Sequence, residues 1–377
     1  MDYGEEALKK HKKLRGKIGV ELKDTLDSKD KLSIYYTPGV AAVSSYVAKN
    51  PDETRNYTWL NNSVAVISDG SAVLGLGNIG PYGALPVMEG KCMLFKHFAN
   101  IDAVPIVLNV HIADEIVAAV KAIAPSFGGI NLEDIAAPIC FEVEERLKEE
   151  LDIPIMHDDQ HGTAIVVLAG LINAMKVVGR ELSDAKIVVA GAGAAGTAII
   201  KLLHLYAKPR IFAVDSKGVI GANRNDLNDE KKKLLKYSNF SDTDGSLEDI
   251  LQGADVFIGV SKAGLLTPDM VRSMDKKPII FAMANPTPEI MPDIAKSAGA
   301  SIVATGRSDF PNQVNNALAF PGIFRGALDN QVRMITDDHK IAAAKAIAEL
   351  VEKPDSEHII PSVLDDRLVP AVSKVVR

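Results

Sequence analysis

Residues 186–215 contain the feature that most constrains the fold of this chain. Lys186–Ala190 predicts a buried strand, the stretch from Thr197 to Tyr206 predicts a helix, and Arg210–Val214 predicts a second strand that ends at Asp215. The loop between the first strand and the helix consists of Gly191, Ala192, Gly193, Ala194, Ala195 and Gly196. Its glycines allow a tight turn, close approach of a pyrophosphate and close packing of helix on strand. This order predicts a dinucleotide-binding unit of a doubly wound α/β fold, with Asp215 placed to bind the ribose.

Three further apolar runs predict more strands of the same sheet, and each is followed by a polar residue. Residues 254–260, 278–284 and 300–304 are strand-like, and the candidates that follow them are Ser261, Asn285 and Arg307. Ligands of doubly wound sheets bind outside the carboxyl ends of the strands, so these side chains are site candidates by position. Loops are polar in general, so position alone does not distinguish a ligand contact from an ordinary loop residue. Asn315 and Asn316 form one more polar cluster, just before an apolar segment.

The length and composition of the chain predict a two-domain soluble enzyme. With 377 residues, of which 47% are hydrophobic and 24% charged, the chain is long enough for two domains of ordinary size. We expect a substrate- and metal-binding domain over residues 1–160 and a coenzyme domain over residues 161–377 that includes the C-terminal helices. The net charge of −7 argues against a nucleic-acid partner.

The chain also lacks the usual signs of a membrane or secreted protein. No uncharged apolar run reaches the length of a membrane span, and residues 1–15 contain no apolar signal core. Cys92 and Cys140 stand alone, which argues against a disulfide framework or a thiolate zinc site. We therefore expect a cytoplasmic protein.

Two pairs of adjacent acids indicate a metal site. Asp158 and Asp159 follow a short apolar strand, and we expect a long helix to begin a little later, at about Gly162. Glu133 and Asp134 follow a predicted strand in the same way, and they can share one ion only if the backbone leaves strand geometry there. Carboxylates are suited to a divalent ion that prefers oxygen ligands. The alternative for both pairs is acids that favour a helix dipole.

Tyr36 and Lys91 are candidates for acid and base. Pro38 constrains the turn that holds Tyr36 just before a helical pattern. Lys91 opens an apolar helical run, and at the first turn of a buried helix the dipole lowers the pKa of a lysine. The alternatives are a packing tyrosine and a lysine that reaches the surface. The glycine-rich segment Gly75–Gly83 does not precede a predicted helix, so we expect a close backbone approach near a ligand or a domain interface and no nucleotide loop.

These candidates together indicate one kind of chemistry. A nicotinamide coenzyme accepts hydride from an alcohol carbon, and a carboxylate-held divalent ion polarises the alcohol and the ketone that it becomes. The same ion stabilises an enolate after loss of CO2. Such a reaction needs a base for the hydroxyl and an acid for the enolate carbon, for which Lys91 and Tyr36 are the available pair.

The sequence resembles the malic enzymes, particularly their short bacterial and archaeal form, over nearly its whole length. The segments that carry the resemblance are Tyr36–Ala41, Glu89–Lys91, Leu132–Ile135, His157–Thr163, Gly191–Gly196, Ala284–Thr287 and Asn315–Gly322. They fall in the order of the family's tyrosine, lysine, first metal, second metal, coenzyme and two asparagine motifs. The resemblance implies a malic-type α/β domain followed by a Rossmann-type domain that binds NAD or NADP.

The resemblance also implies roles for single residues. Glu133, Asp134 and Asp159 bind Mg²⁺ or Mn²⁺, and Asp158 assists Lys91. Lys91 deprotonates the C2 hydroxyl of L-malate during hydride transfer, and Tyr36 protonates enolpyruvate after decarboxylation. The substrate carboxylates are held by Asn285 and by Asn316 or Asn315. The family also implies a homodimer.

Some questions stay open at this level. Ala72 stands where larger members of the family carry a substrate-binding arginine, so carboxylate binding must come from elsewhere. Asp215 favours the free ribose hydroxyl of NAD, whereas Ser216 and Lys217 beside it could bind the 2′-phosphate of NADP, and we expect NAD with NADP tolerated. The competing interpretations are a two-domain hydroxy- or amino-acid dehydrogenase without decarboxylation and a non-catalytic dinucleotide sensor.

Overall fold

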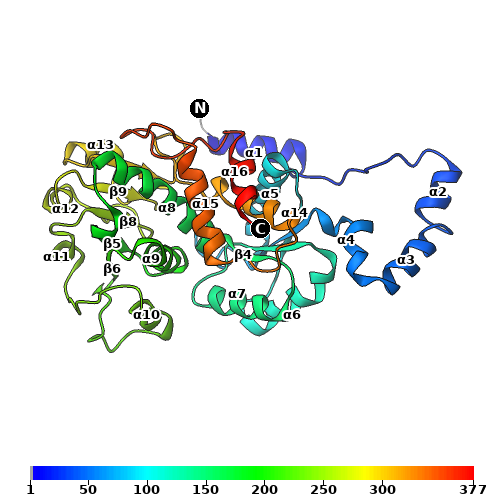
Figure 1. Ribbon diagram of the computed structural model, residues 1–377, viewed down its shortest axis with the longest axis horizontal. Coiled ribbons are helices and arrows are strands. Elements are labelled where there is room, and N and C mark those ends of the chain that lie inside the picture. Colours follow the sequence, from blue (N-terminus) through cyan, green and yellow to red (C-terminus); the bar gives the residue numbers. More distant parts are fainter. Residues whose placement is uncertain (1–2) are drawn as a thin grey trace.

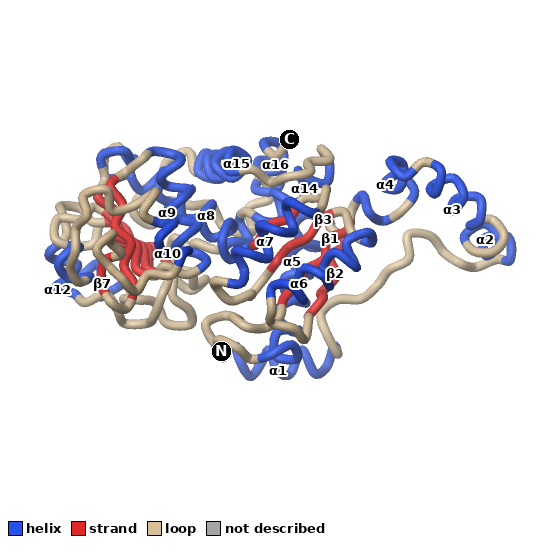
Figure 2. Tube along the Cα trace, turned by 90° about the horizontal axis from the view of Figure 1, so that it is seen from below, coloured by secondary structure: helices blue, strands red, loops and turns tan. Residues whose placement is uncertain are grey.

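A computed structural model describes residues 3–377 as two α/β units joined side by side, with a helical arm that projects from one end (Figure 1). Figure 2 shows the two sheets as separate groups of strands, one in each unit. This arrangement confirms the predicted fold class of two α/β domains.

The first sheet has four parallel strands in the order β2-β1-β3-β4. Its strands are β1 (Ser63–Ser68), β2 (Asp102–Val107), β3 (Gly129–Leu132) and β4 (Ile155–His157). The helices that connect them are α5 (Gly80–Ala99), α6 (Ala113–Ile123) and α7 (Ile139–Glu150). Every residue of β1 is buried because the strand lies inside the sheet and helices cover its faces, which explains the continuous apolar run in the sequence.

The second sheet has six strands in the order β10-β9-β8-β5-β6-β7, with only β7 antiparallel. Its strands are β5 (Lys186–Ala190), β6 (Arg210–Asp215), β7 (Gly218–Val219), β8 (Val256–Gly259), β9 (Ile279–Ala282) and β10 (Ile302–Thr305). The helices between them are α9 (Ala194–Ala207), α10 (Asp229–Leu234), α11 (Leu247–Leu251), α12 (Pro268–Ser273) and α13 (Pro292–Ser297). The chain reverses its direction of winding between β5 and β8, which is where ligands of such sheets bind.

Helix α8 (Asp158–Val178) is the structural link between the two units. It follows β4 directly and packs against α9 of the second unit, so it shares the main hydrophobic core with both. It begins at Asp158, four residues before the predicted start near Gly162, so both acids lie in its first turn. The helix is long and apolar enough to cross a membrane, but 78% of that stretch is buried inside the protein, as expected for a core helix.

The C-terminal helices are α14 (Phe320–Asp329), α15 (Asp337–Glu349) and α16 (Leu368–Val375). Helix α15 packs on α8, whereas α14 packs on α5 of the first unit. The C-terminal segment therefore contacts both units, and the division at residue 160 stays a prediction. The two cysteines are free and buried.

The N-terminal helices are α1 (Tyr3–Leu14), α2 (Lys29–Tyr35), α3 (Val40–Lys49) and α4 (Thr54–Tyr57). None of them has a buried residue. In both views α2 and α3 lie beyond the body, at one end of its long axis (Figures 1 and 2).

Candidate active site

The carboxyl ends of the first sheet gather acids from three strands. Asp69 follows β1, Glu133 follows β3 and Asp158 follows β4. Because parallel strands end at the same edge of a sheet, residues far apart in the sequence become neighbours there. The carboxylate of Asp69 stabilises the loop after β1: it accepts hydrogen bonds from the backbone and hydroxyl of Ser71 and contacts His111 Nδ1 at 3.0 Å.

Glu133, Asp134 and Asp159 form a three-carboxylate cluster. One oxygen from each lies within 4.8 Å of the others. Strand β3 ends at Leu132, and Asp134 has a left-handed backbone with φ 53°, so the backbone leaves strand geometry at the place where the sequence required it. Asp134 N–H donates to Asp159 Oδ2 at 2.8 Å, which fixes one acid against another.

These residues fit a divalent cation with a preference for oxygen ligands. Asp134 Oδ2 is buried without a hydrogen-bond partner in the structure. Burial, with Asp159 nearby, raises the pKa of Asp134 to about 7, and burial raises the pKa of Glu133 as well. Crowded, desolvated carboxylates of this kind are stabilised by a bound cation, and oxygen donors suit Mg²⁺ or Mn²⁺.

Lys91 lies beside this cluster, but not where the sequence placed it in its helix. It is in the middle of α5, which begins at Gly80, so the prediction that the helix dipole lowers its pKa is wrong. Burial disfavours the charged ammonium, yet Asp158 and Glu133 outweigh burial and raise the pKa of Lys91. Lys91 Nζ lies 2.6 Å from Asp158 Oδ2 and 2.9 Å from Glu133 Oε1.

Phe320 completes the surroundings of Lys91, a contact that sequence reasoning missed. Its ring centroid lies 4.2 Å from Lys91 Nζ, and the ring excludes water from one side of the ammonium. Phe320 is the first residue of α14, so the C-terminal segment closes this pocket. A phenylalanine in an apolar segment gives no sequence signal for such a role.

Glu144 is a second residue that the sequence did not reveal. It is buried, accepts a hydrogen bond from the backbone N–H of His157 at 2.9 Å and lies 2.8 Å from His161 Nε2. Burial opposes its ionisation, but His161 and Lys148 hold the pKa of Glu144 well below its usual range. Glu144 thus ties α7 to the start of α8, where Asp158 and Asp159 stand.

Tyr36 is not brought together with the other catalytic candidates. It follows α2 on the projecting arm and its residue surface is 67% exposed. Figure 1 shows α2 and α3 at the opposite end of the unit from α8. The single chain therefore assembles Lys91 and Asp158 without Tyr36.

The loop before α5 forms the wall between the acids and the second unit. The helix starts at Gly80, so the glycine-rich segment does lead into a helix, contrary to the sequence prediction. Ala72 N–H donates to the backbone oxygen of Asp134 at 3.0 Å. A side chain at Gly75, whose φ is +84°, would meet the backbone oxygen of Asn285 within 2.6 Å. The predicted close backbone approach is therefore present, between the acids and Asn285.

Of the two neighbouring asparagines, Asn316 is closer to the acids. A side chain added at Gly162 would meet Asp158 Oδ1 and Asn316 Cβ, so these three residues are adjacent. Asn315 instead uses its side-chain oxygen to accept a hydrogen bond from Ala317 N–H at 2.8 Å.

The coenzyme loop borders a cavity of about 690 Å³ at the point where the second sheet changes winding. Among the predicted residues, this cavity is lined by Gly191, Ala192, Asp215 and Ser261. A Cβ at Gly196 would lie 1.8 Å from the oxygen of Gly191, which explains the glycine needed for helix–strand packing. Of the remaining loop residues, Gly193 precedes α9, whereas Ala194 and Ala195 are the first two residues of this helix, which begins at Ala194 rather than at Thr197.

Asp215 lies in the cavity wall, but its carboxylate is already engaged. Arg224 donates to both oxygens, at 2.7 and 3.1 Å, and Lys231 Nζ donates to Oδ2 at 2.6 Å. Although burial opposes it, these cations lower the pKa of Asp215 to about 2. Lys217 and Lys262 also line the cavity, so its lining carries more basic than acidic side chains. The sequence did not reveal the pairing, because Arg224 and Lys231 follow Asp215 without a recognisable motif.

Two other features lie apart from these groups. Arg307 forms an ion pair with Asp309 at 2.6 Å and donates to the backbone oxygen of Pro286 at 3.1 Å.

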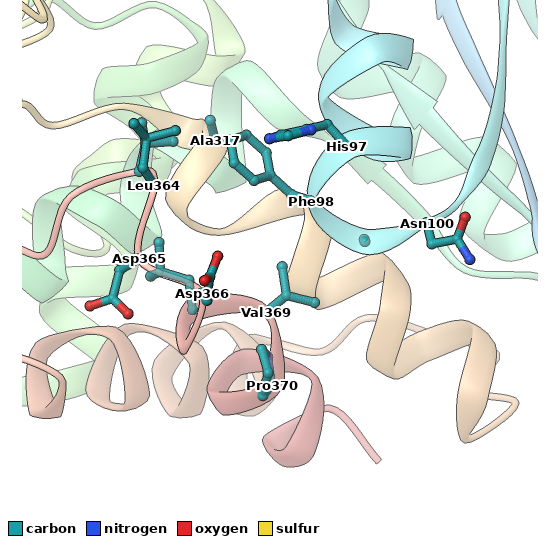
Figure 3. A pocket seen from close by; sticks show the side chains of 12 residues that line it. His97, Phe98, Asn100, Ala317, Leu364, Asp365, Asp366, Val369 and Pro370 are labelled. Atoms are coloured by element: carbon teal, nitrogen blue, oxygen red, sulfur yellow. The ribbon is translucent and has the colours of Figure 1, made fainter.

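A second cavity, of about 490 Å³, lies between the end of α5 and the C-terminal segment, where His97 and Phe98 face Leu364 and Val369 (Figure 3). None of the predicted site residues lines it.

The fold and the site together define a class of protein. A Rossmann-type sheet with a coenzyme cavity stands beside an α/β unit whose strand ends hold a lysine and a carboxylate cluster. This is a two-domain, dinucleotide-dependent oxidoreductase with a candidate metal site.

Comparison with known proteins gives the family. Residues 15–148 match the family model "Malic enzyme, N-terminal domain" and residues 160–375 match "Malic enzyme, NAD binding domain". The chain is 56% identical, over 100% of its length and 92% of the relative, to the bifunctional malic/malolactic enzyme of Bacillus subtilis. It is 53% identical, over 96% of its length and 76% of the relative, to the NAD-dependent malic enzyme of Geobacillus stearothermophilus. Other relatives are NADP-dependent malic enzymes.

The solved structures agree with this result. The crystal structure of the NAD-dependent malic enzyme of Thermotoga maritima superposes with a TM-score of 0.95 at 50% identity, covering 98% of each chain. The chain belongs to the malic enzyme family. The resemblance identified from the sequence motifs is thereby confirmed.

Proposed function

We propose that this chain catalyses the oxidative decarboxylation of L-malate to pyruvate and CO2, with reduction of NAD⁺ or NADP⁺. The observation that carries the proposal is the position of Lys91 Nζ, 2.6 Å from Asp158 and 2.9 Å from Glu133, at the edge of a three-carboxylate cluster. Hydroxy-acid oxidation needs a base next to a polarised alcohol, and this geometry supplies the base and the ligands for the polarising ion. Membership of the malic enzyme family supports the same reaction.

Lys91 is the proposed base for the C2 hydroxyl. Its amine accepts the hydroxyl proton while hydride leaves C2 for the nicotinamide, and Asp158 keeps the amine in position. Glu133, Asp134 and Asp159 would hold a divalent cation, whose positive charge would polarise the C2 oxygen and offset the carboxylates that raise the pKa of Lys91. Phe320 keeps the ammonium desolvated, which makes its charge state sensitive to these neighbours.

Tyr36 is the proposed acid for the carbon that loses CO2. Its phenolic O–H bond breaks as a C–H bond forms at C3 of the enolate, and solvent returns the proton to the phenolate. The amides of Asn285 and Asn316 donate hydrogen bonds to the substrate carboxylates in place of the arginine replaced by Ala72. Asn316 is the stronger candidate of the two neighbouring asparagines because it lies beside Asp158 and Gly162.

The coenzyme cavity supports NAD with NADP accepted. The turn at Gly191 and the N-terminus of α9 are placed for the pyrophosphate. Arg224 and Lys231 neutralise Asp215, so a 2′-phosphate meets less repulsion than it would from a free carboxylate.

A second candidate activity is the formation of lactate from malate. The relative that is 56% identical is named a bifunctional malic/malolactic enzyme. In this variant of the reaction hydride returns to the ketone carbon before the coenzyme leaves, and Lys91 returns the proton to the oxygen. The same residues therefore serve both outcomes.

We further propose that the protein acts in the cytoplasm as a homodimer. The body presents several exposed apolar side chains, which suit an association surface.

The deciding experiment incubates the purified chain with L-malate, Mn²⁺ and either coenzyme. We expect reduced coenzyme, pyruvate and CO2 in equal amounts, and no turnover after chelation of Mn²⁺. Reduced coenzyme without CO2 would instead support a dehydrogenase that does not decarboxylate. Lactate formed with a catalytic amount of NAD⁺ would establish the second candidate.

A further inference from the structure

Glu144 is a carboxylate on the buried face of α7. It shares that face with Cys140, Val143 and Leu147, and only 5% of its residue surface is exposed. A carboxylate loses favourable hydration when it is buried, so it needs charged or hydrogen-bonding partners there. Because its neighbours on this face are apolar, the packing of α7 does not itself require an acid at this position. The partners of Glu144 therefore indicate its role.

Three of the four partners of Glu144 belong to the N-cap and first turn of α8. Oε1 accepts the backbone N–H of His157 at 2.9 Å, and Oε2 accepts from Gln160 Nε2 at 3.4 Å. Oε2 also lies 2.8 Å from His161 Nε2, which must donate because a carboxylate only accepts. The fourth partner is Lys148, one turn along α7, whose Nζ lies 2.7 Å from Oε1. Both oxygens therefore join α7 to the same turn of α8.

These contacts replace a cap that α8 does not provide for itself. His157 is the N-cap residue of α8, and its side chain makes no cap hydrogen bond. In a capping box, a side chain three residues later accepts the backbone N–H of the N-cap residue. Gln160 occupies that position in α8, but Glu144 of the neighbouring helix is the acceptor, and Gln160 donates to it. A residue outside α8 therefore sets the orientation of its first turn.

That turn carries two acids with different partners. Asp158 Oδ2 lies 2.6 Å from Lys91 Nζ, and Asp159 Oδ2 accepts the backbone N–H of Asp134 at 2.8 Å. Successive residues of an α-helix lie about 100° apart around its axis, so one rotation of the turn decides where both carboxylates point. Within residues 3–377, the hydrogen bonds and ion pairs of Glu144 reach neither Lys91 nor the three-carboxylate cluster. Glu144 can therefore act on these groups only through the turn that it holds.

We propose that Glu144 is a positioning residue of the malate reaction, which holds the first turn of α8 so that Asp158 faces Lys91 while Asp159 faces the metal-binding acids. This role rests on the proposed function, which assigns Asp158 to the base and Asp159 to the cation. Without the carboxylate of Glu144 the turn is free to rotate, and both aspartates leave their partners together. Metal affinity and turnover should then fall in the same variant.

The test is Glu144→Gln, with Glu142→Gln as the matched control. Glutamine has nearly the same shape, but an amide nitrogen replaces one oxygen, so it cannot accept at the places of both His157 and His161. Glu142 lies two residues earlier on the exposed face of α7, where it pairs with Arg146. Calorimetry on the metal-free protein should show Mn²⁺ affinity reduced by about 10- to 100-fold in Glu144→Gln. Its kcat should fall as well, whereas the control retains both wild-type values.

Affinity for NAD⁺, measured without metal, separates positioning from a general loss of structure. The residues that line the coenzyme cavity all belong to the second unit, so the dissociation constant and KM for NAD⁺ should stay at their wild-type values in Glu144→Gln. A parallel loss of NAD⁺ and Mn²⁺ binding would overturn the positioning role, and so would wild-type Mn²⁺ affinity.

His161→Ala is the second variant if Glu144→Gln does not fold. It removes one donor to the same carboxylate and should weaken Mn²⁺ binding in the same direction, with NAD⁺ affinity unchanged. Wild-type Mn²⁺ affinity in this variant would likewise count against the positioning role. A wild-type protein that binds Mn²⁺ without turning over malate would refute the proposed function alone, since the comparison of Mn²⁺ affinities still decides the role of Glu144.

Discussion

Lys91 and Tyr36 are the proposed base and acid of one reaction, yet the chain treats them in opposite ways. Lys91 is 7% exposed and held between two carboxylates and an aromatic ring. Tyr36 is 67% exposed on an arm without contacts to the body. The difference teaches that the packing of the chain brings the metal-binding acids and the base together but leaves the proposed acid apart from them.

The largest expected effect comes from Lys91→Ala. Turnover should fall by up to about 10⁴-fold, because the general base is lost. Stability should also fall by about 3–5 kcal/mol, since Asp158 and Glu133 remain buried without their cation. Turnover and thermal unfolding of the metal-free protein measure the two effects. An unchanged melting temperature would mean that the pair is not a structural unit.

Tyr36→Phe should reduce turnover by about 10²–10³-fold without changing the melting temperature. The hydroxyl of Tyr36 contributes nothing to the fold in the exposed arm, so only the chemistry should respond. Tyr35→Phe is the matched control, because Tyr35 is its neighbour on the same arm and its hydroxyl bonds Asp24. Equal losses in both variants would assign the effect to the arm's structure and remove Tyr36 from the chemistry.

Affinity for Mn²⁺ should depend on pH through Asp134. Its pKa is raised to about 7, first by burial and then by Asp159, so the folded protein holds a proton there below that pH. Binding must then expel this proton, and affinity should fall by about tenfold for each pH unit below 7. Titration of Mn²⁺ by calorimetry at pH 8, 7 and 6 measures this slope. A constant affinity over that range would place the ion away from Asp134.

The smallest expected effect concerns the choice of coenzyme. Arg224→Ala removes the two hydrogen bonds that Arg224 donates to Asp215 and leaves that of Lys231, so the less neutralised carboxylate should favour the ribose hydroxyl of NAD⁺ and repel the phosphate of NADP⁺. The ratio of kcat/KM for NADP⁺ to that for NAD⁺ should fall by roughly tenfold, as expected for loss of a charge-assisted hydrogen bond. Lys232→Ala is the control, because Lys232 pairs with Asp229. An equal change in the control would show a general charge effect.

Much of this architecture could be predicted from the sequence, because it depends on local order. The strand, glycine loop, helix and acid of residues 186–215 are contiguous in the sequence, so their order alone predicts the dinucleotide-binding unit. The acid pairs also follow their strands directly, so their meeting at one sheet edge follows from parallel topology. The sequence also predicts that Glu133 and Asp134 can share one ion only if the backbone leaves strand geometry there, and the left-handed backbone of Asp134 meets this condition.

The rest depends on contacts between distant segments. The local pattern around Lys91 predicts a helix that begins there and a lowered pKa, but α5 starts at Gly80, and the carboxylates that raise the pKa of Lys91 follow β3 and β4. Phe320 and Glu144 act through packing that no nearby motif reveals. Tyr36 lies on the predicted turn before a helix, but no local sequence pattern indicates which surface the arm that carries it contacts.

The most direct measurement compares Mn²⁺ binding and malate turnover in the wild-type protein and in Asp159→Ala. Asp269→Ala, which removes an exposed carboxylate from α12, is the control. We predict that Asp159→Ala weakens Mn²⁺ binding and lowers metal-dependent turnover by at least about 100-fold each, because Asp159 supplies one of the three clustered carboxylates, whereas the control retains both. Wild-type Mn²⁺ affinity in Asp159→Ala would contradict the proposed metal site.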